Sequence, residues 1–289
     1  MVARERSGQR RSLAPDGHAR VCPQSDFVPA VRLGMSVLTE DHGPVRIVTI
    51  DRPECRNAVD RPTAAALLEA FEDFEADHEL RVAILTGSNG AFCAGADLKA
   101  VSTGSGNRIV VDGSGPMGPT RLDLSKPVIA AIEGHAVAGG LELAVWCDLR
   151  IAASDAVLGV YCRRWGVPLV DGGTIRLPRL IGASRASDMI LTGRGVKAEE
   201  ALAIGLVNRI ADPGAALHDA FALADELAAL PQNCMRSDLR SSKAQWSLDM
   251  PAALLYETTL GLGVVASGET RDGATRFADG AGRHGQAVT

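Results

Sequence analysis

The sequence lacks the clustered ligand motifs and long apolar runs that identify metal or membrane proteins. Its six cysteines form no Cys-x-x-Cys pair, and its six histidines show no His-Glu-x-x-His spacing. Reduced, buried thiols are therefore favoured over disulfides or a zinc site. No apolar run reaches the roughly 18 to 20 residues of a bilayer crossing, and no signal-peptide hydrophobic region follows the basic start. We expect a cytoplasmic protein with neither metal nor membrane contact.

Lysine is scarce, with 4 residues against 26 arginines, and the formal net charge is -5. A surface that reads nucleic-acid phosphates needs concentrated Lys and Arg, so nucleic acid is not expected as a general partner. The 46% hydrophobic and 22% charged residues are ordinary for a globular protein. At 289 residues, the chain is long enough to bury a sizeable core.

Three segments differ in composition. Residues 1–34 are rich in Arg, Ser and Pro, which predicts a disordered N-terminal extension or an upstream start before a true start at Met35. A transit peptide is the alternative, which the acidic residues Glu5, Asp16 and Asp26 weaken. We expect residues 35–212 to form the core and residues 213–289 to form a helical region involved in oligomerisation.

Strands and helices alternate through the first part of the expected core. Extended segments are predicted at 45–50, 82–86, 128–132 and 149–153, with helices at 61–76 and 140–147. Asp60 is the predicted cap of the first helix, and Ala65, Leu68 and Phe71 are its predicted apolar face. This alternation predicts an α/β fold with a largely parallel sheet and right-handed crossovers.

The pattern after Gly172 is mostly helical, and only residues 207–210 look extended. The predicted helices cover residues 174–181, 184–192, 198–203, 215–229, 234–246 and 252–266. This composition predicts a helical C-terminal layer that packs across a neighbouring subunit.

Two short apolar runs that carry glycine, residues 91–99 and 134–144, each follow a predicted strand and open a predicted helix. Backbone N–H groups at such junctions have no helical partner, and two sets can converge on one carbonyl oxygen that gains negative charge. The sequence therefore predicts an oxyanion hole.

A glycine-rich segment, residues 104–118, contains a formal Gly-x-Gly-x-x-Gly at 113–118. Dinucleotide binding would need a helix to open there, but Pro116 and Pro119 obstruct that pattern. A mobile surface loop near a pocket is the favoured interpretation.

The order and spacing of several motifs resemble the enoyl-CoA hydratase/isomerase (crotonase) superfamily over residues 36–277. The motifs are the Asp-Arg-Pro-Glu-Cys-Arg-Asn-Ala turn at 51–58, the run at 92–99, the Lys-Pro strand at 126–130, the helix start at 139–144 with Cys147-Asp148, and Gly-Gly-Thr at 172–174 with Leu177-Pro178. The resemblance implies an α/β, crotonase-like core of repeated ββα units, shared with the Clp protease, and a helical C-terminal layer. It also implies an acyl-CoA substrate, with no separate cofactor, fatty-acid degradation, and a homotrimer or dimer of trimers.

The resemblance further implies that the N–H groups of Ala96 and Gly139 hold the thioester oxygen. Polarising that carbonyl lowers the barrier to enolate formation. A glycine needed only for close packing at the helix start is the alternative for Gly139. The implied substrate contacts are Arg56, Ala58, Ala94, Ala96, Asp97, Leu98, Gly139, Cys162 and, from an adjoining subunit, Lys243. Lys243 is equally interpretable as an ordinary surface charge.

Glu142 lies three residues after Gly139, among apolar neighbours. A carboxylate there is paired or functional, because burial is costly and raises its pKa, and this environment suits a general acid/base. The alternatives are a cap of its own helix or an ion pair with Arg163 or Arg164.

A second glutamate, which hydratases of the resembled family carry about a dozen residues before Gly-Gly-Thr, is replaced here by Cys162. Water addition then lacks one of two proton-handling groups, which makes hydratase activity doubtful. Asp171 is similar in position to an aspartate of the dienoyl-CoA isomerase branch, so it is a candidate second proton-transfer group; a helix cap is the equal alternative. For Cys162, a buried structural thiol is favoured over a nucleophile.

Two other function classes compete with this one. A non-catalytic acyl-CoA binding protein would keep the oxyanion hole and lose the proton chemistry, and the retained Glu142 argues against it. A serine peptidase is excluded because no Ser, His and Asp can be assigned to the matching loops.

Overall fold

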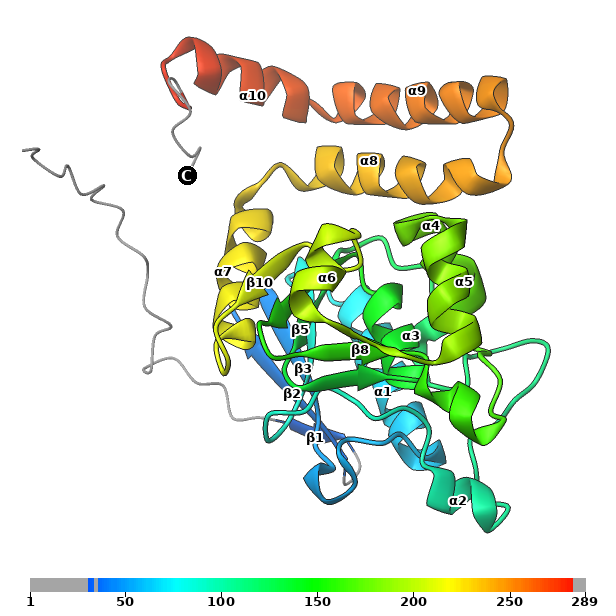
Figure 1. The fold of residues 1–289 in the computed structure, drawn as a ribbon. Coiled ribbons are helices and arrows are strands. Elements are labelled where there is room, and N and C mark those ends of the chain that lie inside the picture. Colours follow the sequence, from blue (N-terminus) through cyan, green and yellow to red (C-terminus); the bar gives the residue numbers. More distant parts are fainter. Residues whose placement is uncertain (1–30, 34–35, 283–289) are drawn as a thin grey trace, which may run out of the picture.

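The computed structural model describes residues 31–33 and 36–282. Its larger sheet has the strand order β1-β2-β3-β4-β5-β7-β10 (Figure 1). The strands are β1 (Val31–Leu33), β2 (Val37–His42), β3 (Val45–Ile50), β4 (Val82–Gly87), β5 (Val128–Ile132), β7 (Leu149–Ala153) and β10 (Arg209–Ala211). Pairs from β3 to β10 are parallel, with Ile47 opposite Ile84, while β1, β2 and β3 pair antiparallel. The predicted, largely parallel sheet is therefore confirmed.

A smaller sheet has the strand order β6-β8-β9. Its strands are β6 (His135–Val137), β8 (Val157–Gly159) and β9 (Gly195–Lys197). β6 pairs parallel with β8, and β8 pairs antiparallel with β9. These three-residue strands are too short to show a period in the sequence, so the sequence pattern did not predict them.

Helices cover both faces of the larger sheet. α7 (Ala216–Ala229) packs its alanines and Leu223 against the face that carries Ile47, Ile84 and Ile129. α1 (Arg61–Ala76) and α3 (Gly139–Trp146) belong to the apolar cluster on the other side, where the rings of Phe71 and Trp146 meet edge to face at 4.9 Å.

The N-terminus of α1 is capped as predicted, because Asp60 accepts a hydrogen bond from Thr63 N at 3.0 Å. The predicted apolar face is confirmed at Phe71, which is buried, and Leu68 is half-buried. It is wrong at Ala65, which is exposed, while Leu67 is buried instead. Residues 64–68 are all apolar, so the helical period had no polar residue there to fix its phase.

Shorter elements surround the second face. They are α2 (Leu98–Ser102), α4 (Gly173–Ile181), α5 (Ala183–Thr192), α6 (Ala198–Ala203), and the 3-10 turns η1 (Pro53–Cys55), η2 (Pro119–Arg121) and η3 (Tyr161–Trp165). A further 3-10 turn, η4 (Gln245–Ser247), precedes the last two helices. The helices predicted at 174–181, 184–192 and 198–203 are thus confirmed within one residue.

The last three helices lie outside the core as a separate layer (Figure 1). α8 (Gln232–Ala244) packs on α9 (Met250–Ser267), and α10 (Glu269–Ala278) contacts both. None of the three buries a residue, and α9 exposes Leu254, Leu255, Leu262 and Val265. This layer therefore presents a large apolar surface.

The predicted N-terminal extension lies outside the described residues except for Val31–Leu33, which pair with β2 as strand β1. Among the helices of residues 36–282, none is long and apolar enough to cross a membrane.

Candidate active site

A cavity of about 650 Å³ lies between the start of α3, the segment 94–98, the loop 104–117 and the segment 161–171. Apolar side chains make up most of its wall. The polar side chains in the wall are Arg56, Arg61, Asn107, Glu142, Tyr161 and Asp171. A cavity of this size and lining suits a small-molecule ligand with an apolar portion.

The two glycine-bearing runs meet at this cavity. Cys93 N donates to His135 O at 2.9 Å, and Val137 N donates back to Cys93 O at 3.1 Å. Gly95 has a φ of +94°, and a Cβ atom there would lie 2.9 Å from Gly139 N. The structure thus brings together two segments that are far apart in sequence, and their contact requires glycine.

Ala96 is held by bonds of its neighbours to Val59. Val59 N donates to Gly95 O at 2.8 Å, and Asp97 N donates to Val59 O at 3.0 Å. In such a parallel bridge the N–H of the middle residue points away from the partner strand. Ala96 lines the cavity, and its N–H has no acceptor in the part of the chain that the structure describes. This amide is available to a ligand.

Gly139 opens α3 directly after a sharp turn. Ala138 holds a φ of +54°, an uncommon value for a residue with a side chain, and no side chain caps the helix. As the first residue of the helix, Gly139 has no helical acceptor, and none is found elsewhere in residues 36–282. A Cβ atom at 139 would lie 2.7 Å from Met117 Sδ, so the flexible Met117 side chain would have to shift. The packing explanation for this glycine stays a prediction.

Glu142 lies one turn into α3 and is 2% exposed. Its Oε1 accepts hydrogen bonds from Asp171 N at 2.9 Å and from Gly173 N at 2.8 Å. The carboxyl group therefore sits at the start of α4 and does not cap its own helix. The ion-pair alternative is also wrong, because Arg163 and Arg164 donate to carbonyl groups at the end of α5.

Burial raises the pKa of Glu142 to about 7; the amide of Gly173 opposes that rise, and the negative charge of Asp171 adds to it. A carboxyl group with this pKa is present in both protonation states near neutral pH. It can therefore accept a proton in one step and return it in another.

Asp171 is 3% exposed and lines the same cavity. Its Oδ1 accepts from Met117 N at 2.9 Å and from the hydroxyl group of Thr120. It does not cap α4, whose cap is Gly172, because the positive φ of Gly172 turns the chain and leaves Asp171 bonded to residues 117 and 120. The cap alternative is therefore wrong, and burial raises the pKa of Asp171. Its role in proton transfer stays a prediction.

Cys162 lies in η3 and lines the cavity. Burial raises the pKa of its thiol, and the negative charge of Glu142 acts in the same direction. A thiol held in its protonated form is a poor nucleophile, which agrees with a structural or contact role.

The remaining predicted contacts divide into two groups. Arg56, Ala94 and Leu98 line the cavity. Ala58, Asp97 and Lys243 do not: Ala58 is buried, Asp97 caps α2, and Lys243 pairs with Asp148 at 2.8 Å. Contacts of these three with substrate, including one from an adjoining subunit, stay predictions.

Sequence reasoning missed how the loop 104–118 and η2 support the site. Met117 packs on Gly139, and Arg176 ties this region to α4 by donating to Asp171 O and Thr120 O, each at 2.8 Å. The glycines of the loop suggested a border of a pocket, and the loop does line the cavity. No motif, however, marked Met117 or Thr120. In the described residues, no cluster of three or more His, Cys, Asp or Glu side chains could hold a metal ion.

The site can therefore do two things chemically. Two amides that lack an acceptor in the described part of the chain border one cavity and can bind an oxygen atom that gains negative charge. A carboxyl group with a pKa of about 7 can move a proton beside that oxygen atom.

Comparisons with known proteins identify the family of the chain. The family model for enoyl-CoA hydratase/isomerase matches residues 40–282. The enoyl-CoA hydratase EchA19 of Mycobacterium tuberculosis is 35% identical over 256 residues, covering 86% of this chain and 96% of the relative. A carnitinyl-CoA dehydratase of Salmonella arizonae is 43% identical over 188 residues, covering 64% of this chain and 72% of the relative.

Among solved structures, the enoyl-CoA hydratase EchA1 of Mycobacterium marinum matches with a TM-score of 0.80 and 38% identity, over 84% of this chain and 96% of that chain. An enoyl-CoA hydratase of Mycobacterium tuberculosis matches with a TM-score of 0.80 and 37% identity, over the same shares. The crotonase-like fold expected from the sequence is thereby confirmed.

The raised pKa of Glu142 predicts a pH-dependent stability. The folded protein keeps its proton up to about pH 7, whereas the unfolded chain loses it near pH 4.5. The free energy of unfolding of the wild type should therefore fall relative to Glu142→Gln as pH rises between these values, by up to about 3 kcal/mol. Urea unfolding across this pH range measures the difference.

The side-chain amide of the Glu142→Gln variant can still accept from the two backbone amides, so the variant keeps the anchoring contacts. The exposed substitution Glu79→Gln is the matched control and should parallel the wild type. Parallel curves for wild type and Glu142→Gln would contradict the assignment.

Proposed function

The chain belongs to the enoyl-CoA hydratase/isomerase family, and from that premise we propose that it converts an acyl-CoA thioester by stabilising an enolate. The observation that carries this proposal is the meeting, at one cavity, of a buried carboxyl group and two amides that have no acceptor among the described residues. Coenzyme A is part of the substrate in this proposal, and no separate cofactor takes part.

In the proposed complex, the thioester oxygen accepts hydrogen bonds from Ala96 N–H and Gly139 N–H. Negative charge grows on that oxygen when a proton leaves the carbon next to the carbonyl, or when a nucleophile adds one carbon further along. Fixed backbone donors in a cavity stabilise this charge, and loss of one such donor costs roughly 3 to 4 kcal/mol in other enzymes.

Glu142 is the proposed acid/base. Both of its hydrogen bonds engage Oε1, so the carboxyl group is anchored through one oxygen and exchanges its proton at Oε2. Its pKa of about 7 lets the ionised form remove a proton from carbon and the protonated form return it.

The shape and charge of the cavity suit the two ends of the substrate. Arg56 and Arg61 lie in its wall and supply positive charge for the anionic coenzyme. Ile109 and Met117 of the loop 104–118, with Val167 and Val170, supply an apolar wall for the acyl chain. This lining supports a fatty acyl group and a place in fatty-acid degradation, and the loop would set the preferred chain length.

Water addition and double-bond isomerisation use this arrangement differently. Relatives named enoyl-CoA hydratase and carnitinyl-CoA dehydratase support addition or removal of water. The second candidate, isomerisation alone, rests on the expectation from the resemblance that Cys162 takes the place of a second glutamate. Isomerisation needs one group that moves a proton between two carbons, and Glu142 is sufficient for that.

Replacing Glu142 by Gln should lower kcat about 100- to 10,000-fold and leave acyl-CoA binding within a few-fold of the wild type, because the amide keeps the anchor and cannot exchange the proton. The assay follows 2-enoyl-, 3-enoyl-, 2,4-dienoyl- and 3-hydroxyacyl-CoA of short and long chains, with binding measured by calorimetry. Tight binding without turnover in both proteins would contradict catalysis and favour the acyl-CoA binding alternative.

Replacing Cys162 by Glu should raise the rate of water addition at least about 10-fold relative to isomerisation, because it restores a second proton-handling carboxyl group in the same cavity. The two products are separated by chromatography after reaction of a 2-enoyl-CoA and a 3-enoyl-CoA. Cys162→Gln is the matched control, since it adds the same bulk without an ionisable group. An equal product ratio in Glu and Gln variants would show that position 162 does not decide the reaction.

We also propose that the C-terminal layer assembles the chain into a homotrimer or a dimer of trimers. Apolar side chains dominate the exposed face of α9, and Leu255 is 70% exposed. Contiguous exposed apolar surface on this scale marks an interaction site.

Leu255→Asp should reduce the mass in solution from that of a trimer or hexamer toward that of one chain, because the charge would be buried at the subunit contact. Size-exclusion chromatography with light scattering measures this change. Val111→Asp, on a fully exposed residue outside the layer, is the control. A wild-type protein of single-chain mass would contradict the proposed assembly.

A further inference from the structure

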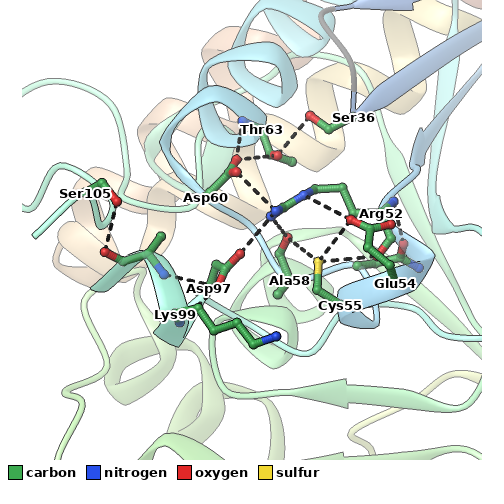
Figure 2. Close-up of polar contacts among 12 residues, drawn as sticks. Ser36, Arg52, Glu54, Cys55, Ala58, Asp60, Thr63, Asp97, Lys99 and Ser105 are labelled. Carbon is green, nitrogen blue, oxygen red and sulfur yellow. Dashed lines mark hydrogen bonds and ion pairs between the residues drawn. The ribbon is translucent and has the colours of Figure 1, made fainter. Parts of the chain in front are cut away.

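An arginine outside the cavity holds the segment that presents the Ala96 amide. Arg52 does not line the cavity, and its side chain is only 18% exposed. It follows β3 and precedes η1, so it lies at the end of the sheet beside residues 94–98 (Figure 2).

The guanidinium group of Arg52 joins three parts of the chain. Its Nη1 donates to Ala58 O at 2.6 Å, and its Nη2 donates to Asp97 Oδ2 at 3.1 Å. The same Nη2 lies 3.2 Å from Asp60 Oδ2. Figure 2 shows the three contacts converging on one side chain.

The carboxylates of Asp97 and Asp60 each also cap a helix, and these hydrogen bonds hold them in place. Asp97 Oδ1 accepts from Lys99 N at 3.0 Å and from Ala100 N at 3.3 Å, which caps α2. Asp60 Oδ1 accepts from Thr63 N at 3.0 Å, which caps α1. Arg52 therefore ties two helix starts together through groups that are themselves held.

The contacts of Arg52 lie on both sides of Val59, the residue that is paired with Ala96. Ala58 and Asp60 flank Val59, the residue whose N–H and C=O hold Gly95 and Asp97 on either side of Ala96. The salt bridge to Asp97 fixes the residue directly after Ala96. Loss of Arg52 would leave Asp60 and Asp97, two partly buried carboxylates, facing each other without the cation between them.

We propose that Arg52 is a positioning residue for the oxyanion hole: by clamping Ala58, Asp60 and Asp97, it keeps the Ala96 N–H aimed into the cavity. This inference rests on the proposed function, because it assigns a purpose to the orientation of that amide. A misplacement of about 1 Å at such a donor can cost roughly 100-fold in rate.

The test compares Arg52→Met and Arg52→Lys with the wild type. Lys keeps the charge but lacks the planar fork that reaches Ala58 O and the two carboxylates together. We expect kcat to fall about 10- to 100-fold in both variants, with the Kd for an unreactive acyl-CoA changing less than about threefold. The infrared carbonyl stretch of that bound thioester, labelled with carbon-13, should shift less from its value in water than it does in the wild type.

A control is available in Arg46, an arginine of similar burial that Asp41 on the β2–β3 hairpin binds through two bonds of 2.7 and 2.8 Å. Arg46→Met should lower thermal stability without changing kcat or the carbonyl stretch. Asp97→Asn provides a second variant that keeps the cap of α2 and weakens only the ionic contact, and it should reproduce part of the loss in kcat.

The outcomes separate the two proposals. If the wild type binds and converts acyl-CoA while both Arg52 variants keep its kcat and carbonyl stretch, the positioning role is overturned and the proposed function stands. If the wild type neither binds nor converts any acyl-CoA, the proposed function fails, and the role of Arg52 fails with it. A loss of kcat that Arg46→Met reproduces would likewise overturn a specific role for Arg52.

Discussion

The close approach of residues 93–97 to the start of α3 is the constraint on which the site depends. A side chain at Gly95 would collide with Gly139 N, so the two backbones touch without anything between them. The adjoining N–H groups of Asp97 and Ala138 have acceptors within the described structure, whereas those of Ala96 and Gly139 have none there. An unmade buried hydrogen bond costs about 1–3 kcal/mol. The surrounding ladder keeps those donors open, which makes them available to an oxygen atom of a ligand.

The same junction explains the state of Glu142. α3 starts at the contact, so its first turn carries Glu142 into the cavity wall, where the start of α4 supplies two amides to one carboxyl oxygen. These bonds favour the ionised form, and burial opposes it more strongly. Asp171 adds negative charge nearby, while Arg176 binds backbone carbonyls beside both groups. The balance leaves a carboxyl group that exchanges its proton near neutral pH, and it results from backbone placement more than from any ion pair.

Local patterns in the sequence were sufficient to predict an element where the residues of that element determine its structure. The strand at 128–132, the cap at Asp60 and most C-terminal helices follow from period and capping residues, and the structure has them. Local sequence patterns gave wrong predictions where contacts with a distant segment determine the structure. The face of α1 was ambiguous within its alanine run, and Asp171 looked like a cap because nothing local shows that residues 117 and 120 approach it. The cavity residues 96, 139 and 142 were predicted because their motifs are contiguous. Met117, Arg176 and Arg52 were not assigned roles, because they act across the fold.

Membership of the family does not determine whether the chain adds water or moves a double bond. That difference depends on a few side chains of the cavity. In the proposed mechanism the thioester is held by backbone amides, which few substitutions could remove. The steps after enolate formation depend on side chains that can change freely. In this chain Cys162 keeps its proton because burial and the negative charge of Glu142 raise its pKa, whereas the pKa of Glu142 is about 7. Glu142 is thus the cavity carboxyl best placed to exchange a proton at neutral pH. Under the proposed mechanism, a reaction that needs one such group is therefore the one we expect, whatever the length of the acyl chain.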